Sequence, residues 1–266
     1  MGDGETSRRK DEHLDIVLNK NVEFDVLTTG FECVNIITKS LPEVDLSEVN
    51  TVTEFMDKKI SAPILISALT GGTKRTKEIN LQLAKTAEQL RIPICLGSQR
   101  AMLEDKSKTE TFRIVKENAG SVPVVGNFGI VQLKHYGPEP LLDAVERVGA
   151  DGLAIHINPE QEVVQYEGDT EFSGCLAALK DLIKHSGSIK IMVKQVGHGI
   201  DRDTADTLLR IGGDYLVVAG SGGTSCTKVE SLRSKARFHV FNELGIPTVV
   251  SILMACLLYT SPSPRD

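Results

Sequence analysis

Tryptophan is absent from this 266-residue chain, and aromatic residues make up only 5% of it. Stacking platforms for single-stranded nucleic acid and carbohydrate clefts both depend on such rings, so neither kind of site is favoured. Basic residues are in the minority as well, because 36 acidic side chains outnumber 30 basic ones and give a formal net charge of -6. Nucleic-acid-binding proteins usually carry an excess of basic charge. We therefore expect no nucleic-acid partner.

Cysteines and long apolar runs are also scarce. The cysteines are odd in number and show no C-x-x-C spacing, which indicates reduced thiols and a cytoplasmic setting. No apolar run is long enough to span a bilayer, and residues 1–20 are charged, unlike a signal peptide. We expect no membrane partner. With 41% hydrophobic and 25% charged residues, the composition is typical of one large globular domain.

Short apolar runs bounded by Gly and Pro alternate with helical patterns from residue 62 onward. This alternation predicts a parallel sheet with crossover helices. Its even spacing favours a TIM (β/α)8 barrel, here truncated after about six βα units, over a doubly wound sheet. No strand opens a G-x-G-x-x-G turn, so a Rossmann site is not indicated. The predicted strands are 62–66, 92–96, 122–126, 152–155, 189–193 and 215–219, and the predicted helices include 79–90, 109–118, 140–148, 175–185 and 204–211.

Polar side chains follow these apolar runs directly. Each has a local explanation as a helix cap or turn residue, but a lysine that closes a buried strand needs a partner. The carboxyl ends of parallel strands meet at one edge, where α/β proteins bind ligands. We therefore predict an active site at the top of the barrel. The side chains concerned are Thr70, Ser98, Arg100, Asn127, His156, Asn158, Gln161, Glu162, Lys194 and Thr224.

The polar segment around which the chain is organised is His156-Ile-Asn-Pro-Glu-Gln-Glu162, which follows the strand predicted at 152–155. A carboxylate beside carboxamides suits an oxygen-preferring cation such as Mg²⁺, and this cation in turn suits a phosphorylated substrate. The alternative is a polar loop that leaves a strand.

The first sixty residues are polar and irregular in pattern. They contain Arg8-Arg-Lys-Asp-Glu-His13, which is either a solvated arm or an anion clamp. If this arm folds over the active site, Arg9, Lys10 and His13 would hold a phosphate.

Seven segments of the chain form a recognisable set. They are Arg9-Lys10…His13, Ser67-Ala-Leu-Thr-Gly-Gly72, Gly97-Ser-Gln-Arg100, Asn127-Phe-Gly129, His156-Ile-Asn-Pro-Glu-Gln-Glu162, Val193-Lys194 and Gly222-Gly-Thr-Ser225. In this order and spacing they resemble type 2 (FMN-dependent) isopentenyl-diphosphate delta-isomerase, a TIM-barrel family. The resemblance extends from about residue 8 to about residue 255.

The resemblance implies a role for each motif. Gln161, His156 and Lys194 would be catalytic, with Lys194 stabilising negative charge on the reduced flavin, and Glu162 would hold Mg²⁺. FMN would contact Ala68, Leu69, Thr70, Ser98, Asn127, Lys194 and Thr224. The substrate would contact Arg9, Lys10, His13, Ser98, Gln99, Arg100, His156, Asn158 and Gln161.

The implied reaction interconverts isopentenyl and dimethylallyl diphosphate in isoprenoid biosynthesis. In the family, reduced FMN, which NADPH recharges, moves a proton onto one alkene carbon while another carbon loses one, with no net redox change. No side chain easily protonates an unactivated alkene, so the flavin supplies that group and the protein supplies orientation and electrostatics. A homo-oligomer is expected for the full-length protein.

Some positions depart from the family's pattern. Cys226 replaces an aromatic residue, Gln195 replaces a common Glu, and His198 lies between Gly197 and Gly199. These departures remove no group assigned to catalysis.

Another FMN- or phosphate-binding TIM barrel is an alternative interpretation of the chain. A 2-hydroxyacid oxidase would need a His-Arg pair after a late strand, which we do not find, and an IMP dehydrogenase-like enzyme would use Cys226 as its nucleophile. A non-catalytic diphosphate-binding barrel is a third interpretation.

The resemblance ends near residue 255. We expect 1–255 to form an incomplete FMN-binding barrel domain, in which 1–60 is an N-terminal extension that carries the substrate-binding basic residues. The segment 256–266 resembles a translated sequencing adapter, and its Ser-Pro-Ser-Pro composition suits no barrel element, so we expect a non-native tail. A natural disordered tail is the alternative. The family's next βα units include a Gly-Gly-(Ile/Leu)-Arg turn that grips the FMN phosphate.

A barrel without its last strands exposes two sheet edges and its core. We therefore expect the 266-residue chain to be unstable and to bind FMN poorly, as measured by thermal unfolding during an FMN titration. A cooperative transition with submicromolar FMN affinity would contradict this expectation. Sequencing the coding DNA past codon 255 gives an independent check, since a frame that continues into Gly-Gly-(Ile/Leu)-Arg would identify the tail as an artefact.

Overall fold

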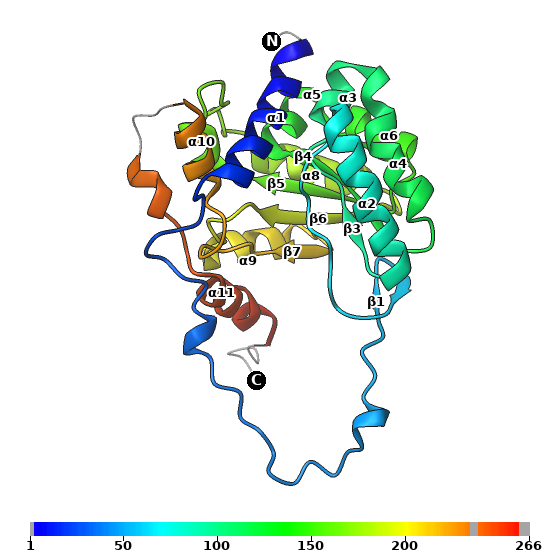
Figure 1. Cartoon of the computed structure of the whole chain (residues 1–266), viewed down its shortest axis with the longest axis vertical. Coiled ribbons are helices and arrows are strands. Elements are labelled where there is room, and N and C mark those ends of the chain that lie inside the picture. The colour runs from blue at the N-terminus through cyan, green and yellow to red at the C-terminus, as the bar shows by residue number, and fades with distance from the viewer. Residues whose placement is uncertain (1–2, 235–238, 261–266) are drawn as a thin grey trace.

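The computed structural model describes residues 3–234 and 239–260. A curved parallel sheet forms its centre (Figure 1). The sheet contains β3 (Ile94–Cys95), β4 (Val124–Gly129), β5 (Gly152–Ile157), β6 (Lys190–Gln195) and β7 (Tyr215–Val217), hydrogen-bonded in chain order. All neighbours are parallel, so the five carboxyl ends lie along one edge. The predicted α/β barrel architecture is confirmed, with the sheet curled as part of a barrel.

The strand predicted at 62–66 is present only as an isolated parallel bridge between Ile66 and Ile94. Pro63 has no N–H to donate, and the N–H of Ile64 donates to the carbonyl of Ala62 at 2.8 Å, which curls the segment. The chain therefore joins the edge of the sheet at a single point. The other five predicted strands agree with the structure to within a few residues.

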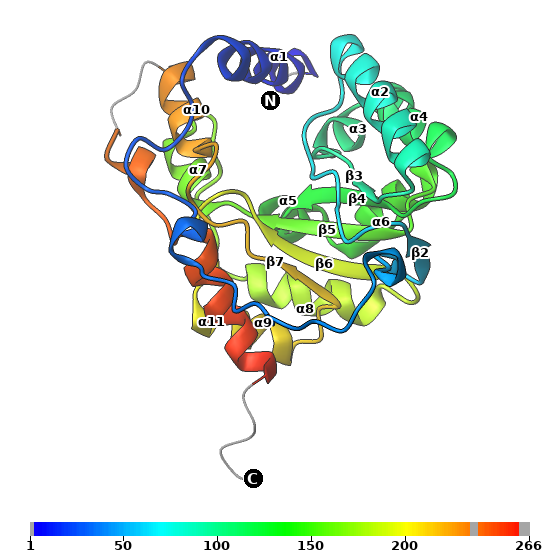
Figure 2. The same cartoon turned by 60° about the horizontal axis from the view of Figure 1, so that its bottom comes forward.

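The helices predicted between the strands are confirmed. Figure 2 shows α8 and α9 outside β6 and β7, with α4 and α6 outside the earlier strands. Local sequence explains where these helices begin: Thr73 and Thr76 form a capping box at α2, and the Asp201 side chain caps α9. The helices are α2 (Lys74–Leu90), α4 (Glu110–Asn118), α6 (Pro138–Val148), α8 (Cys175–His185) and α9 (Arg202–Arg210).

Several further elements were not predicted. Three of them, α3, α5 and α7, closely follow a strand and are too short to show helical periodicity, and α1 is too polar to show an apolar stripe. They are α1 (Asp3–Asn19), α3 (Arg100–Glu104), α5 (Ile130–Tyr136), α7 (Pro159–Val164), α10 (Cys226–Ser234), α11 (Thr248–Thr260) and a hairpin of β1 (Thr53–Phe55) and β2 (Lys58–Ile60). Helix α11 includes the first residues of the expected tail, whereas 261–266 lie outside the described residues.

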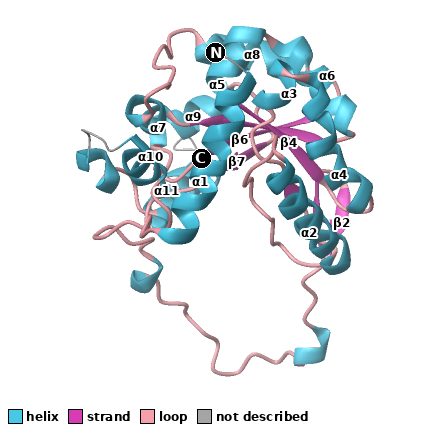
Figure 3. Ribbon diagram, turned by 45° about the horizontal axis from the view of Figure 1, so that its top comes forward, coloured by secondary structure: helices cyan, strands magenta, loops and turns pink. Residues whose placement is uncertain are grey.

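The connection between α1 and β1 follows the outside of the molecule (Figure 3). It contains two single-turn 3-10 helices, Phe31–Cys33 and Leu46–Glu48. Ile36 and Ile37, between these turns, are almost fully exposed. In the described part of the chain, no helix combines the length and apolarity needed to cross a bilayer.

The two faces of the sheet bury different side chains because strand residues alternate in direction. Phe128, Leu153 and Ile191 belong to the main core that packs against the helices. Cys95, Val125, Ala154 and Met192 form a second cluster on the inner face, and Met56 of the hairpin packs onto it. The N–H of Met56 donates to the Tyr215 hydroxyl at 3.0 Å, so the hairpin closes the lower end of the curved sheet below the strand ends that carry the polar residues.

Asp151, just before β5, connects the hairpin, α4 and β4 at this lower end of the sheet. Its Oδ2 accepts hydrogen bonds from the Val124 N–H and from Lys116 Nζ, both at 2.8 Å, and its Oδ1 lies 2.8 Å from Lys58 Nζ. Burial opposes ionisation, but the two lysines and the backbone N–H outweigh it and lower the pKa of Asp151.

Replacing Asp151 by Asn leaves two lysines without their carboxylate, so we expect the free energy of unfolding to fall by about 1–3 kcal/mol at neutral pH. Chemical denaturation measures this change. Because the folded-state pKa of Asp151 is lowered, the stabilisation exists above its usual value and disappears as the pH falls through the folded value. Asp143→Asn is the matched control, since Asp143 pairs with Arg147 on the surface with 52% side-chain exposure. Equal losses in the two variants would contradict the assignment.

Candidate functional site

A cavity of about 460 Å³ opens at the carboxyl edge of the sheet, between the strand ends, α1 and α10. The structure brings together nearly all of the residues predicted for the site, including those from the N-terminal segment. The predicted residues among its lining are Arg9, Lys10, His13, Ala68, Leu69, Thr70, Ser98, Arg100, Asn127, His156, Asn158, Gln161, Glu162, Lys194 and Thr224.

Gln99 is the exception, because its side chain is completely buried outside the cavity lining. Its Oε1 accepts a hydrogen bond from the N–H of Asn127 at 2.8 Å, and its Nε2 lies 3.2 Å from Met102 Sδ. The side chain therefore does not line this cavity, and its contact with the substrate stays a prediction. Gln99 instead holds the end of β4 in place beneath the cavity.

Asn127 and His156 face each other across neighbouring strands. The Asn127 amide nitrogen donates to the carbonyl of Leu96 at 2.9 Å, which fixes the carboxamide so that its Oδ1 faces His156 Nδ1 at 3.0 Å. Burial, reinforced by Lys194, Arg9 and Lys10, lowers the pKa of His156 to about 3. The imidazole is thus neutral, and with Nδ1–H donating to Asn127 its Nε2 carries a lone pair.

Lys194 is the next-to-last residue of β6 and is paired in register with His156. Only 8% of Lys194 is exposed, and its ammonium group has no hydrogen-bond or ion-pair partner among the described residues. Burial lowers the pKa of Lys194, while nearby Cys95 and Cys226 oppose this shift. A buried cation without a protein partner at the lining of a cavity is suited to an anionic ligand.

Helix α1 supplies the basic residues opposite the strand ends. Lys10 Nζ donates to the carbonyl of Ser98 at 2.8 Å and lies 5.3 Å from the centre of the Phe112 ring. Burial and the neighbouring Arg9 lower the pKa of Lys10 to about 7. Arg9 Nη1 donates to the amide oxygen of Gln165 at 2.9 Å in the amide orientation that satisfies both ends of Gln165. The N-terminal segment is therefore a folded helix that carries cations into the site.

Glu162 lies at the cavity wall with its carboxylate held by hydrogen bonds. Its Oε1 accepts from Asn158 Nδ2 at 3.0 Å and its Oε2 from the N–H of Asp169 at 2.9 Å. In residues 3–234 and 239–260, no three His, Cys, Asp or Glu side chains gather as a metal site. Mg²⁺ commonly takes one or two carboxylates and completes its shell with water and substrate phosphates. Glu162 fits that limited role.

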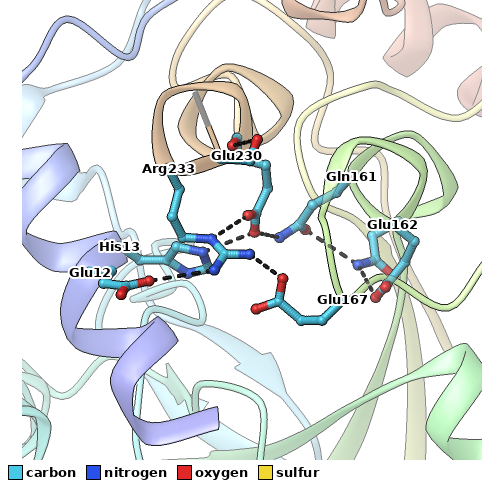
Figure 4. Close-up of polar contacts among 9 residues, drawn as sticks. Glu12, His13, Gln161, Glu162, Glu167, Glu230 and Arg233 are labelled. Carbon is cyan, nitrogen blue, oxygen red and sulfur yellow. Dashed lines mark hydrogen bonds and ion pairs between the residues drawn. The ribbon is translucent and has the colours of Figure 1, made fainter. Parts of the chain in front are cut away.

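The sequence analysis missed Glu230 and Arg233 on α10. Figure 4 shows Glu230 between His13, Gln161 and Arg233. The Glu230 carboxylate lies 2.9 Å from His13 Nε2, accepts from Arg233 Nε at 2.8 Å and accepts from Gln161 Nε2 at 3.3 Å. Burial would raise the pKa of Glu230, but His13 and Arg233 together lower it to about 2. The only sequence signal is a Glu-x-x-Arg spacing, which is also common on solvated helices.

The departures from the family's pattern have local partners. The Cys226 thiol donates to the carbonyl of Val196 at 3.0 Å, and Gln195 Nε2 donates to Glu160 Oε2 at 3.1 Å. His198 is buried, with Phe24 packed edge-on at 6.5 Å between ring centres.

These features define an α/β-barrel protein of the class that binds an anionic ligand above its strand ends. Curated relatives then identify the family. Over 256 residues the chain is 39% identical to isopentenyl-diphosphate delta-isomerase of Methanosarcina barkeri, covering 93% of this chain and 70% of the relative. It is 40% identical over 246 residues to the enzyme of that name from Mycolicibacterium gilvum, covering 92% and 71%. The chain belongs to the type 2 isopentenyl-diphosphate delta-isomerase family.

A relative from Rickettsia bellii with the same name is 40% identical over 254 residues, which cover 93% of this chain and 73% of the relative. Among solved structures, a flavocytochrome b2 variant with sulfite bound superimposes with a TM-score of 0.50 at 14% identity, covering 81% of this chain and 51% of that chain. At this identity the likeness concerns the fold alone. No protein-family model matches the chain.

The pKa of Lys10 predicts a pH dependence for anion binding. Lys10 loses its charge as the pH rises through about 7, so a polyanion loses its partner. Relative to Lys10→Arg, whose guanidinium stays charged, the affinity of the protein for inorganic pyrophosphate is expected to fall about tenfold between pH 6 and pH 8. Calorimetric titration at a series of pH values measures this ratio. A ratio that stays constant over this range would show that Lys10 does not contact the anion.

Proposed function

We propose that this site interconverts isopentenyl and dimethylallyl diphosphate, the activity that the relatives' name describes, with FMN as the bound cofactor. The observation that carries the proposal is Lys194, a buried cation without a partner among the described residues, beside the neutral imidazole of His156. A flavin that becomes anionic on reduction would supply the negative charge that the Lys194 ammonium group lacks. The strand-end residues Ala68, Leu69, Thr70, Ser98, Asn127 and Thr224 line the same cavity and would bind it.

The substrate's diphosphate would lie on the opposite, basic side of the cavity. Arg9 and Lys10 come from α1 and Arg100 from the start of α3, so cations from two elements converge there. Ser98, His13 and Asn158 would add hydrogen bonds. His156 can assist only as an acceptor while its Nε2 is unprotonated, so a bound phosphate group would first have to share a proton with it.

The reacting alkene would then lie between the flavin and Gln161. When bound, FMN, kept reduced by NADPH, supplies the acid–base group that side chains lack for an unactivated alkene. Gln161 is held at both ends, because its Nε2 donates to Glu230 and its Oε1 accepts from Asn158 Nδ2 at 3.3 Å. Glu162, with Mg²⁺ and the diphosphate, would fix the charged end of the substrate.

A cysteine enzyme of the IMP dehydrogenase type is the second candidate, and the environment of Cys226 argues against it. Burial raises the pKa of the Cys226 thiol to about 11, with Lys194 opposing the shift. The thiolate is the nucleophilic form, so a thiol with a raised pKa is a poor nucleophile. Insensitivity of the activity to iodoacetamide would agree with this assignment.

We also propose a cytoplasmic location for the protein. Cys33, Cys95, Cys175 and Cys226 are free thiols, which supports a reducing compartment such as the cytoplasm. A homo-oligomer, and the division of the chain into a barrel domain at 1–255 and a tail at 256–266, stay predictions.

Isomerisation is measured directly by deuterium. With FMN, NADPH and Mg²⁺ present, an intact version of the protein in heavy water is expected to incorporate deuterium into isopentenyl diphosphate. Lys194→Gln removes the charge beside the flavin and is expected to slow the exchange about 100-fold. Lys180→Gln, at an exposed position on α8, is the control and keeps the rate. Flavin binding without any deuterium incorporation would instead support a non-catalytic diphosphate-binding protein.

A further inference from the structure

Helix α1 crosses the mouth of the cavity, between α10 on one side and α2 and α3 on the other (Figure 2). Toward α2 and α3 it is held by Lys10 on the Ser98 carbonyl at 2.8 Å and by Arg75 on Asp15 at 2.7 Å. Among its described side chains only Lys10 is buried, and Leu18 is 68% exposed. Apolar packing therefore contributes little, and polar contacts hold this helix in place.

Toward α10, the contacts converge on Arg233. Its Nε donates to Glu230 at 2.8 Å, its Nη1 lies 3.4 Å from Glu12 Oε2, and its Nη2 donates to Glu167 (Figure 4). The three carboxylates come from three separate parts of the chain: α10, α1 and the loop after α7. The Arg233 side chain is only 11% exposed, so these charges interact with little screening by solvent.

Glu230 connects this cluster to the cavity. One of its oxygens faces Arg233, and the other lies 2.9 Å from His13 and accepts from Gln161. The side chain is fully buried, and a buried carboxylate is stable only while its partners remain. Without Arg233, the Glu230 carboxylate would lose the guanidinium that offsets its charge and fixes its position, so the oxygen that accepts from Gln161 would no longer be held in place.

We infer that Arg233 is a positioning residue that holds α1 closed over the cavity and, through Glu230, fixes the orientation of Gln161. When α1 is docked, Arg9, Lys10 and His13 line the same cavity as the strand ends. An anion bound there contacts both, so binding of the diphosphate and docking of α1 are coupled. Only the clause on Gln161 rests on the proposed function. The closure itself concerns the binding of any polyanion at α1.

Hydrogen exchange of the backbone amides in 3–19 tests the closure, with inorganic pyrophosphate as the probe. In Arg233→Met these amides are expected to exchange about tenfold faster, because hydrogen bonds between charged groups are lost. The affinity for pyrophosphate is expected to fall by a similar factor, while the amides of β5 and β6 keep their protection. Arg75→Met is the matched control, since Arg75 also pairs with α1 but does so in the open, with 43% side-chain exposure.

Arg233→Lys keeps the charge but not the three-way fork, so it separates the closure from general stability. We expect it to loosen α1 without affecting the core, and to lower kcat more than it raises KM for isopentenyl diphosphate, since Gln161 loses its orientation. If α1 exchange and pyrophosphate affinity in Arg233→Met and Arg233→Lys equal those of Arg75→Met, the closure is refuted. The same holds if all segments lose protection equally in Arg233→Lys. Loss of α1 protection in a protein without isomerase activity would refute only the proposed function.

Discussion

The parallel register of β4, β5 and β6 is the constraint on which the site depends. Pairing sets Gly129 beside His156 and His156 beside Lys194, so the groups that meet in the cavity are fixed by backbone hydrogen bonds. A slip of one residue would turn His156 and Lys194 away from each other and place apolar side chains at the strand ends. The same register alternates the buried residues, with Leu153 in the outer core and Ala154 on the inner face. Fold and site thus share one origin.

Burial in the cavity then shifts the pKa of its titratable side chains. The same burial keeps His156 neutral and lowers the pKa of Lys10 and Lys194, so cations exist in the site only at a cost that an anion relieves. Glu230 shows the opposite balance: its nearby partners outweigh burial and keep it ionised. The cavity is therefore prepared for a ligand that brings negative charge, and its acidic residues are already committed to protein partners.

The sequence predicted the elements whose signal is local. A strand such as 152–155 is visible as a short apolar run, and a helix such as 175–185 is visible from its own helical pattern. The polar residues that follow the strands identified the site. Helix α1 was not predicted, because nothing in its own pattern shows what it docks against. Gln99 was assigned to the substrate through the family resemblance of Gly97-Ser-Gln-Arg100, although its side chain turns inward to Asn127. Arg233 and Glu230 were not predicted, because they contact Glu12 and His13, which lie more than 200 positions earlier in the chain.

The hairpin that closes the lower end of the sheet also affects the order in which this protein folds. Met56 meets Tyr215 across 159 positions, and Glu12 meets Arg233 across 221. Contacts so distant along the chain form slowly, because a long loop must close before either is made. During synthesis the first sixty residues leave the ribosome long before β7 and α10 exist, so they must wait without their partners. We therefore expect α1 to dock over the cavity only after the strands have assembled.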